Sequence, residues 1–318
     1  MTPETISPKP SATGWTGGAT ILRRHVGEDG KRISYLAAEG TQRATHPAIL
    51  LIHGAGVSAG SWSLQLQNLG HELQVLAIDL PGHGESDPID KATLEGYADA
   101  ARSLLAALGT GPVFVAGHSL GGAVAQVLAA RHPEVVKGLA LLSTCVKLPE
   151  TDGRLQRFYR FLPAPIRTVL FLWMAKKLLF SPSASRQAML LGMKEILACR
   201  PETAVRDVAA AQAMDLQEIA QNLRVPTLIL CGDRDKVTPL ALSDRLNELI
   251  PGSRLLIVKE AGHMLPLEAP GQVKRELLDF VNSVARRDIH PVPSASEIRK
   301  RSILRRFIEK VATFFRRT

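Results

Sequence analysis

The segment PVFVAGHSLGGAVAQVLAARHP, residues 112–133, carries the strongest indications of both the fold and a reactive site. It begins with a short apolar run, turns through glycines around Ser119, and continues as an alanine-rich segment that ends before Pro133. A buried strand, a sharp turn and a helix form the context in which G-x-S-x-G exposes a reactive serine. Because the motif alone occurs by chance in many proteins, it is this context that indicates Ser119 as a candidate nucleophile.

The same pattern, a short apolar run followed by a polar loop, recurs along the chain. Runs that are apolar at every position are typical of strands buried on both faces of a parallel sheet. They occupy residues 48–54, 75–84, 112–119, 138–144, 226–233 and 253–263. Segments with helical character occupy residues 93–108, 121–131, 239–249 and 270–284. This alternation predicts an α/β fold, with a mostly parallel sheet flanked by helices.

A reactive serine needs a base that takes its proton and an acid that orients the base. Asp233 and Asp235 follow the end of one predicted strand, and His263 follows the end of another. Open α/β sheets place their ligands at the carboxyl edge of the strands, and Ser, Asp, His is the order of one type of hydrolase. We select Asp235 as the acid, because Asp233 lies nearest the strand end, where a carboxylate more often braces a turn.

Attack by a serine on a carbonyl group creates an oxyanion, which needs hydrogen-bond donors. One is expected to be the backbone N–H of Leu120, directly after the candidate nucleophile. The second is assigned to the N–H of Ala55, because loop 53–56 follows a predicted strand and its glycines let the backbone turn inward. The other histidines, His83 and His118 among them, are interpreted as structural or solvated.

The alternation of strand and helix breaks between residues 147 and 222. This interval holds apolar, helical patches separated by prolines, and a loop of such length is improbable in a compact domain. We interpret residues 147–222 as a helical cap inserted into a core of residues 19–146 and 223–285. Residues 1–18, rich in Pro, Ser, Thr and Gly, are predicted to be disordered. The cap side chains selected as candidates for substrate binding are Phe161, Phe171, Trp173 and Met174.

Together these segments resemble the α/β-hydrolase superfamily, in particular its capped group of esterases, lipases, enol-lactonases and C–C bond hydrolases. The resemblance is carried by L-I-H-G-A-G, A-I-D-L-P-G-H-G-E-S-D, G-H-S-L-G-G, L-I-L-C-G-D-R-D-K-V-T-P and E-A-G-H-M-L-P-L-E-A-P, in that order, over about residues 20–285. It implies one role for each candidate: nucleophile for Ser119, acid for Asp235, base for His263, and backbone donors for Ala55 and Leu120. It implies a mainly structural role for Asp79.

Two departures narrow the expected chemistry. Ser119 stands where haloalkane dehalogenases and most epoxide hydrolases of this fold have aspartate, and Met264 follows the base where C–C hydrolases usually have tryptophan. Hydrolysis of a carboxylic ester is therefore favoured, and the apolar cap suggests a lipophilic one. A lactonase or C–C bond hydrolase, an acyltransferase, and a ligand-binding receptor or scaffold with little turnover remain open. No cofactor and no metal is predicted.

The net charge of +9 is concentrated at the C-terminal end. Ten basic and only three acidic residues follow residue 285. Apolar side chains recur there at helical spacing, at Ile298, Ile303, Leu304, Phe307, Ile308, Val311, Phe314 and Phe315. Residues 286–318 are therefore predicted to form a proline-containing linker and a basic amphipathic helix that contacts an anionic membrane. Nucleic acid is not expected as a partner, because no binding motif accompanies the charge.

The expected location follows from what the chain lacks. The N-terminus does not have the pattern of a secretory signal, and no apolar run approaches the roughly 18–20 residues of a membrane span. The three cysteines form no C-x-x-C pair and are expected to be reduced thiols. The sequence thus predicts a cytoplasmic enzyme, peripheral on the cytoplasmic face of the membrane if the C-terminal helix binds there.

Overall fold

The computed structural model describes residues 4–6, 19–28, 30–39, 47–90, 92–149 and 164–289 of the 318-residue chain. The chain divides into two compact units, of which the first ends at Val281 and the second begins at Asn282. Everything described below lies in the first unit, apart from the end of the last helix. The predicted basic helix of the C-terminal segment lies outside the described residues.

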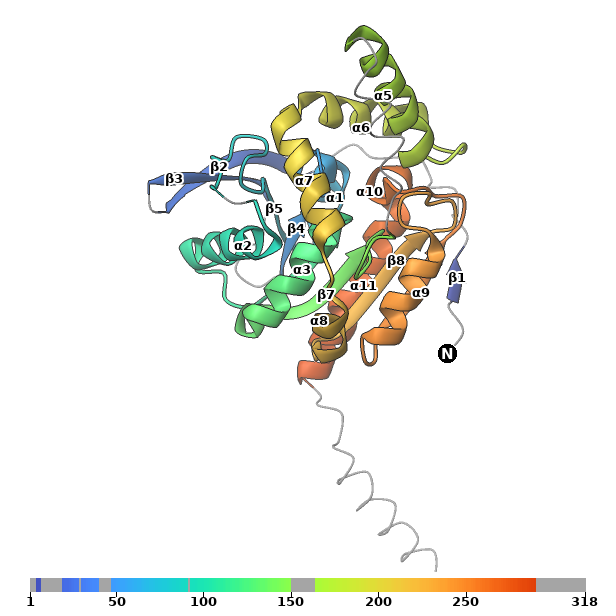
Figure 1. Cartoon of the computed structure of the whole chain (residues 1–318). Helices are drawn as coiled ribbons and strands as arrows, with labels where there is room; N and C mark the ends of the chain where they lie inside the picture. The colour runs from blue at the N-terminus through green and yellow to red at the C-terminus, as the bar shows by residue number, and fades with distance from the viewer. Residues whose placement is uncertain are drawn as a thin grey trace, which may run out of the picture. The chain divides into compact units, whose positions relative to one another are not determined.

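The described strands form one sheet of nine, in the order β1-β9-β8-β7-β6-β4-β5-β3-β2 (Figure 1). Their bounds are β1 Glu4–Ile6, β2 Thr20–Glu28, β3 Lys31–Glu39, β4 Ala48–Ile52, β5 Gln74–Ile78, β6 Val113–His118, β7 Val136–Leu142, β8 Thr227–Gly232 and β9 Arg254–Val258. β2 and β3 pair as an antiparallel hairpin, and β3 pairs antiparallel with β5. All other pairs are parallel, so the predicted α/β fold with a mostly parallel sheet is confirmed.

Helices cover both faces of this sheet. Their bounds are η1 Ala59–Trp62, α1 Ser63–Leu69, α2 Leu94–Leu108, α3 Leu120–Arg131, η2 Pro133–Val135, α5 Ala164–Leu179, α6 Arg186–Ala198, α7 Pro201–Ala213, α8 Gln217–Asn222, α9 Leu240–Leu249, α10 Leu265–Glu268 and α11 Pro270–Ile289. Figure 1 shows α2, α3, α8 and α9 on one face and α1 and α11 on the other. Because both faces are covered, β4 and β6 are buried at every position, including His118 at the end of β6, and the apolar runs of both strands predict this burial.

Three helices, α5, α6 and α7, lie beyond the end of the sheet toward which the parallel strands point (Figure 1). We call these three helices the cap. The predicted cap also included α8, but here the structure differs, because α8 packs against α3 and α9 in the layer of helices on the sheet. Leu216, Ala220 and Leu223 are buried in the main core there, which places the end of the insertion before α8.

Both predicted boundaries at the ends of the core also differ from the structure. Residues 1–18 were expected to be disordered, yet Glu4–Ile6 forms β1 and pairs in parallel with β9. This pairing satisfies backbone groups that an edge strand otherwise leaves open. At the other end α11 continues to Ile289, past the expected boundary at residue 285. Among the described helices, none is long and apolar enough to cross a membrane.

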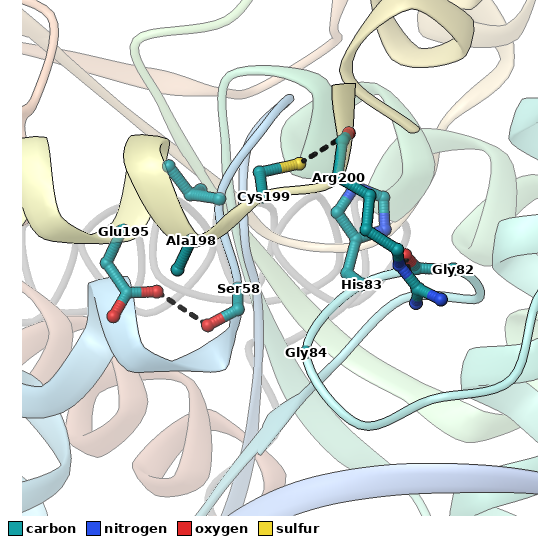
Figure 2. Close-up of a pocket in the computed structure, with 9 residues that line it drawn as sticks. Ser58, Gly82, His83, Gly84, Glu195, Ala198, Cys199 and Arg200 are labelled. Atoms are coloured by element: carbon teal, nitrogen blue, oxygen red, sulfur yellow. Dashed lines mark hydrogen bonds between the residues drawn. The ribbon is translucent and has the colours of Figure 1, made fainter. Parts of the chain in front are cut away.

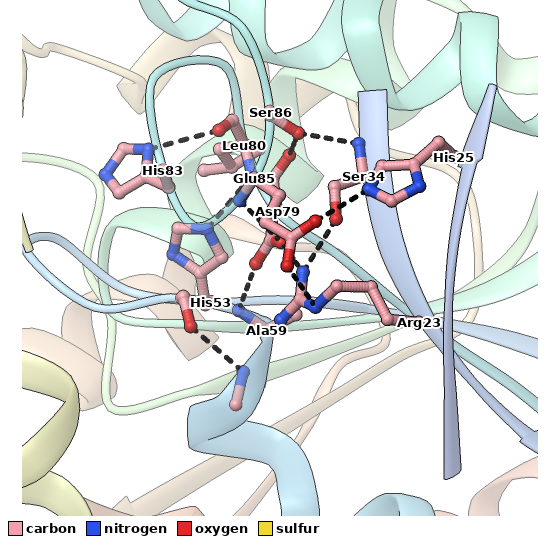
Figure 3. Close-up of polar contacts among 12 residues, drawn as sticks. Arg23, His25, Ser34, His53, Ala59, Asp79, Leu80, His83, Glu85 and Ser86 are labelled. Atoms are coloured by element: carbon pink, nitrogen blue, oxygen red, sulfur yellow. Dashed lines mark hydrogen bonds and ion pairs between the residues drawn. The ribbon is translucent and has the colours of Figure 1, made fainter. Parts of the chain in front are cut away.

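Asp79, at the end of β5, joins the hairpin to the loops of the site (Figure 3). Its fully buried carboxylate accepts hydrogen bonds from the Arg23 guanidinium of β2 and from the backbone N–H of Ala59, the latter at 2.8 Å. Its backbone carbonyl accepts the Ser86 hydroxyl at 2.6 Å. A buried carboxylate with these partners holds η1 and the turn after β5 in place, which agrees with the structural role that the resemblance implied.

Candidate active site

Ser119 lies in a strained turn between β6 and α3. Its φ of 53° is in the left-handed region, which a residue with a side chain rarely adopts and which costs on the order of 1–3 kcal/mol. Two contacts hold the turn: the Ser119 N–H donates to the carbonyl of Leu142 at 2.9 Å, and the Thr144 hydroxyl donates to the carbonyl of Ser119 at 2.7 Å. The turn held in this way presents the Ser119 hydroxyl at the carboxyl edge of the sheet.

The glycines that flank Ser119 permit this turn. A Cβ atom at Gly117 would overlap the backbone of Gly121, and one at Gly121 would overlap the carbonyl groups of Ile52 and His53. Neither obstacle is a flexible side-chain end, so any larger residue would displace the main chain. Close packing of β6, α3 and the loop after β4 thus accounts for both glycines of the motif.

The structure brings Ser119, His263 and Asp235 together. The Ser119 Oγ lies 3.0 Å from Nε2 of His263, and Nδ1 of His263 lies 2.9 Å from Oδ2 of Asp235. The His263 and Asp235 side chains are almost fully buried. Asp233, the alternative acid, is not part of this chain of hydrogen bonds; its carboxylate is partly exposed and lies 3.7 Å from the Lys259 ammonium. The geometry thus favours Asp235 over Asp233.

Three donors hold the Asp235 carboxylate, and Thr238 supplies two of them. The N–H groups of Val237 and Thr238 donate to Oδ1 at 2.9 and 2.8 Å, and the Thr238 hydroxyl donates to Oδ2 at 2.8 Å. Burial alone would raise the pKa of Asp235, but the opposite charge of His263 and the hydrogen bonds lower it overall. An ionised Asp235 accepts from Nδ1–H of His263, which leaves Nε2 free to accept the serine proton. Thr238 was not singled out from the sequence.

The two segments that carry the expected oxyanion donors both lie next to Ser119. Gly54 of loop 53–56 lies so close that an added Cβ would be 3.2 Å from the Ser119 Cβ, and Leu120 begins α3 directly after the serine. Within the described residues, neither the Ala55 nor the Leu120 N–H donates to another protein group. The N-terminus of α3 adds a partial positive charge at this point. Both N–H groups are therefore available to an oxyanion.

His53 holds the first part of this loop. The Leu80 N–H donates to Nε2 of His53 at 3.0 Å, so the ring proton is on Nδ1, which donates to the Gly54 carbonyl at 2.8 Å. Burial, with a smaller contribution from His83, lowers the pKa of His53 to about 4. A neutral His53 with one defined tautomer thus fixes the carbonyl of the Gly54–Ala55 peptide.

His118, next to the serine, supports the base from behind. Its Nε2–H donates to the His263 carbonyl at 2.8 Å, and the centroids of the two rings are 5.1 Å apart. Burial, followed by the charge of His263, lowers the pKa of His118 to about 3. His118 is therefore a neutral, buried support of the His263 loop, a contact that joins residues 145 positions apart in the sequence.

This burial predicts that the protein loses stability in mild acid. The pKa values of His118 and His53 fall from 6.5 in the unfolded chain to about 3 and about 4 in the fold, so the unfolded chain binds more protons below pH 6.5. The stabilising contribution of the two neutral histidines is fully present above pH 6.5. Below that pH, each histidine lowers the free energy of unfolding by about 1.4 kcal/mol per pH unit. The measurement is the free energy of unfolding in urea at several values between pH 7 and pH 5.

A matched pair of variants separates this effect from general acid sensitivity. His118→Gln keeps a donor for the His263 carbonyl but cannot titrate, so the slope with pH should fall by about 1.4 kcal/mol per unit. Ser183→Ala, at an exposed serine that does not titrate in this range, should leave the slope unchanged. An equal slope in the wild type and in His118→Gln would show that His118 is not neutral in the fold.

A cavity of about 310 Å³ lies between two loops of the core and the junction of α6 and α7 (Figure 2). It is lined by Val57, Ser58, Gly82, His83, Gly84, Glu195, Ala198, Cys199 and Arg200. The Ser58 hydroxyl donates to the Glu195 carboxylate across it at 2.5 Å. Because Ser119, His263 and Asp235 do not line this cavity, we do not assign the reacting part of a substrate to it.

The four cap side chains selected from the sequence fare differently. Phe161 lies outside the described residues, and only the backbone of Phe171 is described, as part of α5. Trp173 is 57% exposed, with the Lys177 ammonium 4.8 Å from its ring centroid, and Met174 is partly buried. Neither Trp173 nor Met174 lines the cavity, so their contact with a substrate stays a prediction.

Comparisons with known proteins agree with this fold. A family model described as "Alpha/beta hydrolase family" matches residues 49–276. A pimeloyl-[acyl-carrier protein] methyl ester esterase of Chromobacterium violaceum is 29% identical over 75% of this chain and 96% of its own. A 2-hydroxy-6-oxononadienedioate/2-hydroxy-6-oxononatrienedioate hydrolase of a Pseudomonas species is 28% identical over 73% of this chain and 87% of its own. The solved structure of a thermophilic esterase, 30% identical, superposes with a TM-score of 0.68 over 83% of this chain and 99% of its own.

Proposed function

Since the chain belongs to the alpha/beta hydrolase family, we propose that it hydrolyses carboxylic esters through an acyl-serine intermediate. The observation that carries this proposal is the continuous hydrogen-bonded chain from Ser119 through His263 to Asp235. Two relatives named as esterases support an ester as the substrate. The strained turn at Ser119 and the two free N–H groups beside it fit nucleophilic attack on a carbonyl carbon.

In the proposed reaction, Nε2 of His263 takes the Ser119 proton as Oγ attacks the ester carbonyl. The N–H groups of Ala55 and Leu120 stabilise the oxyanion of the tetrahedral intermediate. The intermediate collapses when the C–O bond to the alcohol breaks, and His263 returns its proton to that alcohol. Water then attacks the acyl-serine in the same way, and the acid and free Ser119 are released. Asp235 holds the His263 ring and stabilises its charged form throughout.

We propose further that the acyl group of the ester substrate is lipophilic. Side chains of the cap support it, because large apolar residues remain exposed on all three of its helices: Trp173, Leu178, Leu190, Leu197, Val205 and Val208. Exposed apolar surface of this kind marks places that bind other apolar groups.

We expect kcat/KM for p-nitrophenyl esters to rise about tenfold or more from acetate to octanoate, because each buried methylene contributes to binding the transition state. The measurement is the initial rate across an acyl series, with the rate of the Ser119→Ala variant subtracted as background. A fluorophosphonate probe labels the wild type in the same preparation. Highest kcat/KM on acetate would contradict the lipophilic pocket, and absence of labelling would contradict the serine hydrolase.

We also propose that the segment after Ile289 holds the protein at anionic membranes, on the strength of its sequence pattern alone. The expected result is co-sedimentation of the full chain with vesicles of phosphatidylcholine and phosphatidylserine, and loss of sedimentation when residues 290–318 are removed. Vesicles of phosphatidylcholine alone serve as the control for charge. Equal sedimentation of both proteins, or binding that ignores the anionic lipid, would contradict the proposal.

A further inference from the structure

Asp207 belongs to helix α7 of the cap, yet its carboxylate is fully buried against the core. Three donors from three separate core segments reach it. The Gly56 N–H and the His83 Nε2–H donate to Oδ2, both at 2.8 Å, and the Tyr97 hydroxyl donates to Oδ1 at 2.9 Å. One cap side chain therefore holds the loop after β4, the turn after β5 and helix α2.

Asp207 and His83 form a buried hydrogen-bonded pair. Nδ1 of His83 faces the carbonyl oxygens of Leu80 and Pro81, each at 3.3 Å, and Nε2 faces the Asp207 carboxylate. Because a carboxylate can only accept, the hydrogen between Nε2 and Asp207 belongs to the His83 ring. Burial alone would raise the pKa of Asp207, but the hydrogen bond and charge of His83, together with Gly56 and Tyr97, lower it overall. The carboxylate is therefore ionised and has no reason to release Gly56.

The contact with Gly56 bears directly on the expected oxyanion donor. His53 fixes the Gly54 carbonyl on one side of Ala55, and Asp207 fixes the Gly56 N–H on the other. In a trans peptide the carbonyl and N–H point in opposite directions, so fixing the Gly54 carbonyl toward His53 turns the Ala55 N–H away from it. The positive φ of Gly56, 66°, completes this turn. The peptide units on both sides of Ala55 are thus held, the first by the core and the second by the cap, so the position of Ala55 between them depends on both contacts.

We infer that Asp207 is a positioning residue for the reaction, through which the docked cap holds the backbone N–H of Ala55 where the oxyanion forms. The inference rests on the proposed ester hydrolysis and adds that the oxyanion site is complete only when α7 is docked. Two other hydrogen bonds at the start of α7 go to the turn after β5 instead: the hydroxyl of Thr203 and the guanidinium of Arg200, the residue before α7, both donate to the Gly82 carbonyl, at 3.1 and 2.6 Å. Removing one of these two hydrogen bonds therefore tests the effect of weaker docking of α7 without removing the contact with Gly56.

The test compares three changes in the full chain. Asp207→Ala removes the acceptor for Gly56, and Asp207→Asn keeps an oxygen in its place. Because Asp207→Ala leaves the buried Nε2–H of His83 without its acceptor, the double variant His83→Leu/Asp207→Leu removes both polar partners and keeps an apolar core, which is tolerated far better. Thr203→Val removes a docking contact without touching the loop. A thermal melt of each variant establishes that it is folded at the assay temperature.

We expect Asp207→Ala and the double variant to lose about 10- to 100-fold in kcat with KM within about threefold, because a misplaced donor weakens only the transition state. The inhibition constant of a trifluoromethyl ketone, whose adduct with Ser119 carries the same oxyanion, should rise by a similar factor. Asp207→Asn should recover most of the activity, and Thr203→Val should match the wild type.

Two results would overturn the inference while the proposed function stands. One is an unchanged kcat in a folded variant that lacks Asp207. The other is an equal loss in Thr203→Val, which would show that docking of the cap, rather than the Gly56 contact, matters. If instead the wild type neither hydrolyses esters nor reacts with a fluorophosphonate, the proposed function fails and the inference fails with it.

Discussion

Replacing Ser119 with alanine is expected to lower kcat for ester hydrolysis by about 10⁶-fold, the loss seen when the nucleophile of a serine hydrolase triad is removed. Its Oγ is the atom that His263 Nε2 reaches at 3.0 Å, and it forms the acyl-enzyme in the proposed mechanism. A residual rate survives, because the N–H groups of Ala55 and Leu120 can still stabilise an oxyanion formed by attack of water. The measurement is kcat on the best p-nitrophenyl ester.

Two further variants make this result specific. Ser183→Ala, at an exposed serine of the loop between α5 and α6, should match the wild type. The double variant Ser119→Ala/His263→Ala should be no slower than Ser119→Ala, because the two side chains act as one unit and their effects do not add. Fluorophosphonate labelling should disappear with Ser119. Labelling that persists in Ser119→Ala would place the nucleophile elsewhere and would remove the assignment.

The candidate site could be predicted because each part of it is marked locally in the sequence. Ser119, Asp235 and His263 each follow an apolar run that forms a strand, and parallel strands bring their carboxyl ends to one edge. The topology of the sheet therefore brings Ser119 and His263 together, although they are 144 residues apart in the chain. The choice of Asp235 over Asp233 also agrees with the geometry, since only Asp235 contacts His263.

The contacts of Asp207 could not be predicted in this way. Gly56, His83 and Tyr97 lie 151, 124 and 110 residues from Asp207, and no spacing or motif relates them. An aspartate on a helix usually faces solvent, so its burial is a property of how the cap docks and not of the local sequence. The predicted end of the cap at residue 222, which included α8, was wrong for a related reason. A short helix looks the same in sequence whether it packs over the edge of a sheet or on its face.

Asp235→Asn is expected to lower kcat by about 10⁴-fold without unfolding the protein. The environment of Asp235 decides how the asparagine sits. The N–H groups of Val237 and Thr238 both donate to the Oδ1 position, so the amide oxygen must occupy it and the NH₂ group must face His263. That NH₂ donates to Nδ1, which moves the ring proton to Nε2. An Nε2–H facing the Ser119 hydroxyl cannot accept its proton, so the nucleophile is not activated.

The matched control is Asp233→Asn, two residues away on the same loop. Among the residues that the structure describes, its carboxylate pairs with the partly exposed Lys259, so kcat should change less than about twofold and stability by less than about 1 kcal/mol. A large loss in Asp233→Asn with little in Asp235→Asn would reverse the assignment of the acid. If Asp235→Asn lowered the free energy of unfolding as well as kcat, Asp235 would serve only to stabilise the loop. If the asparagine moves the His263 ring proton to Nε2, kcat falls while KM and stability stay unchanged.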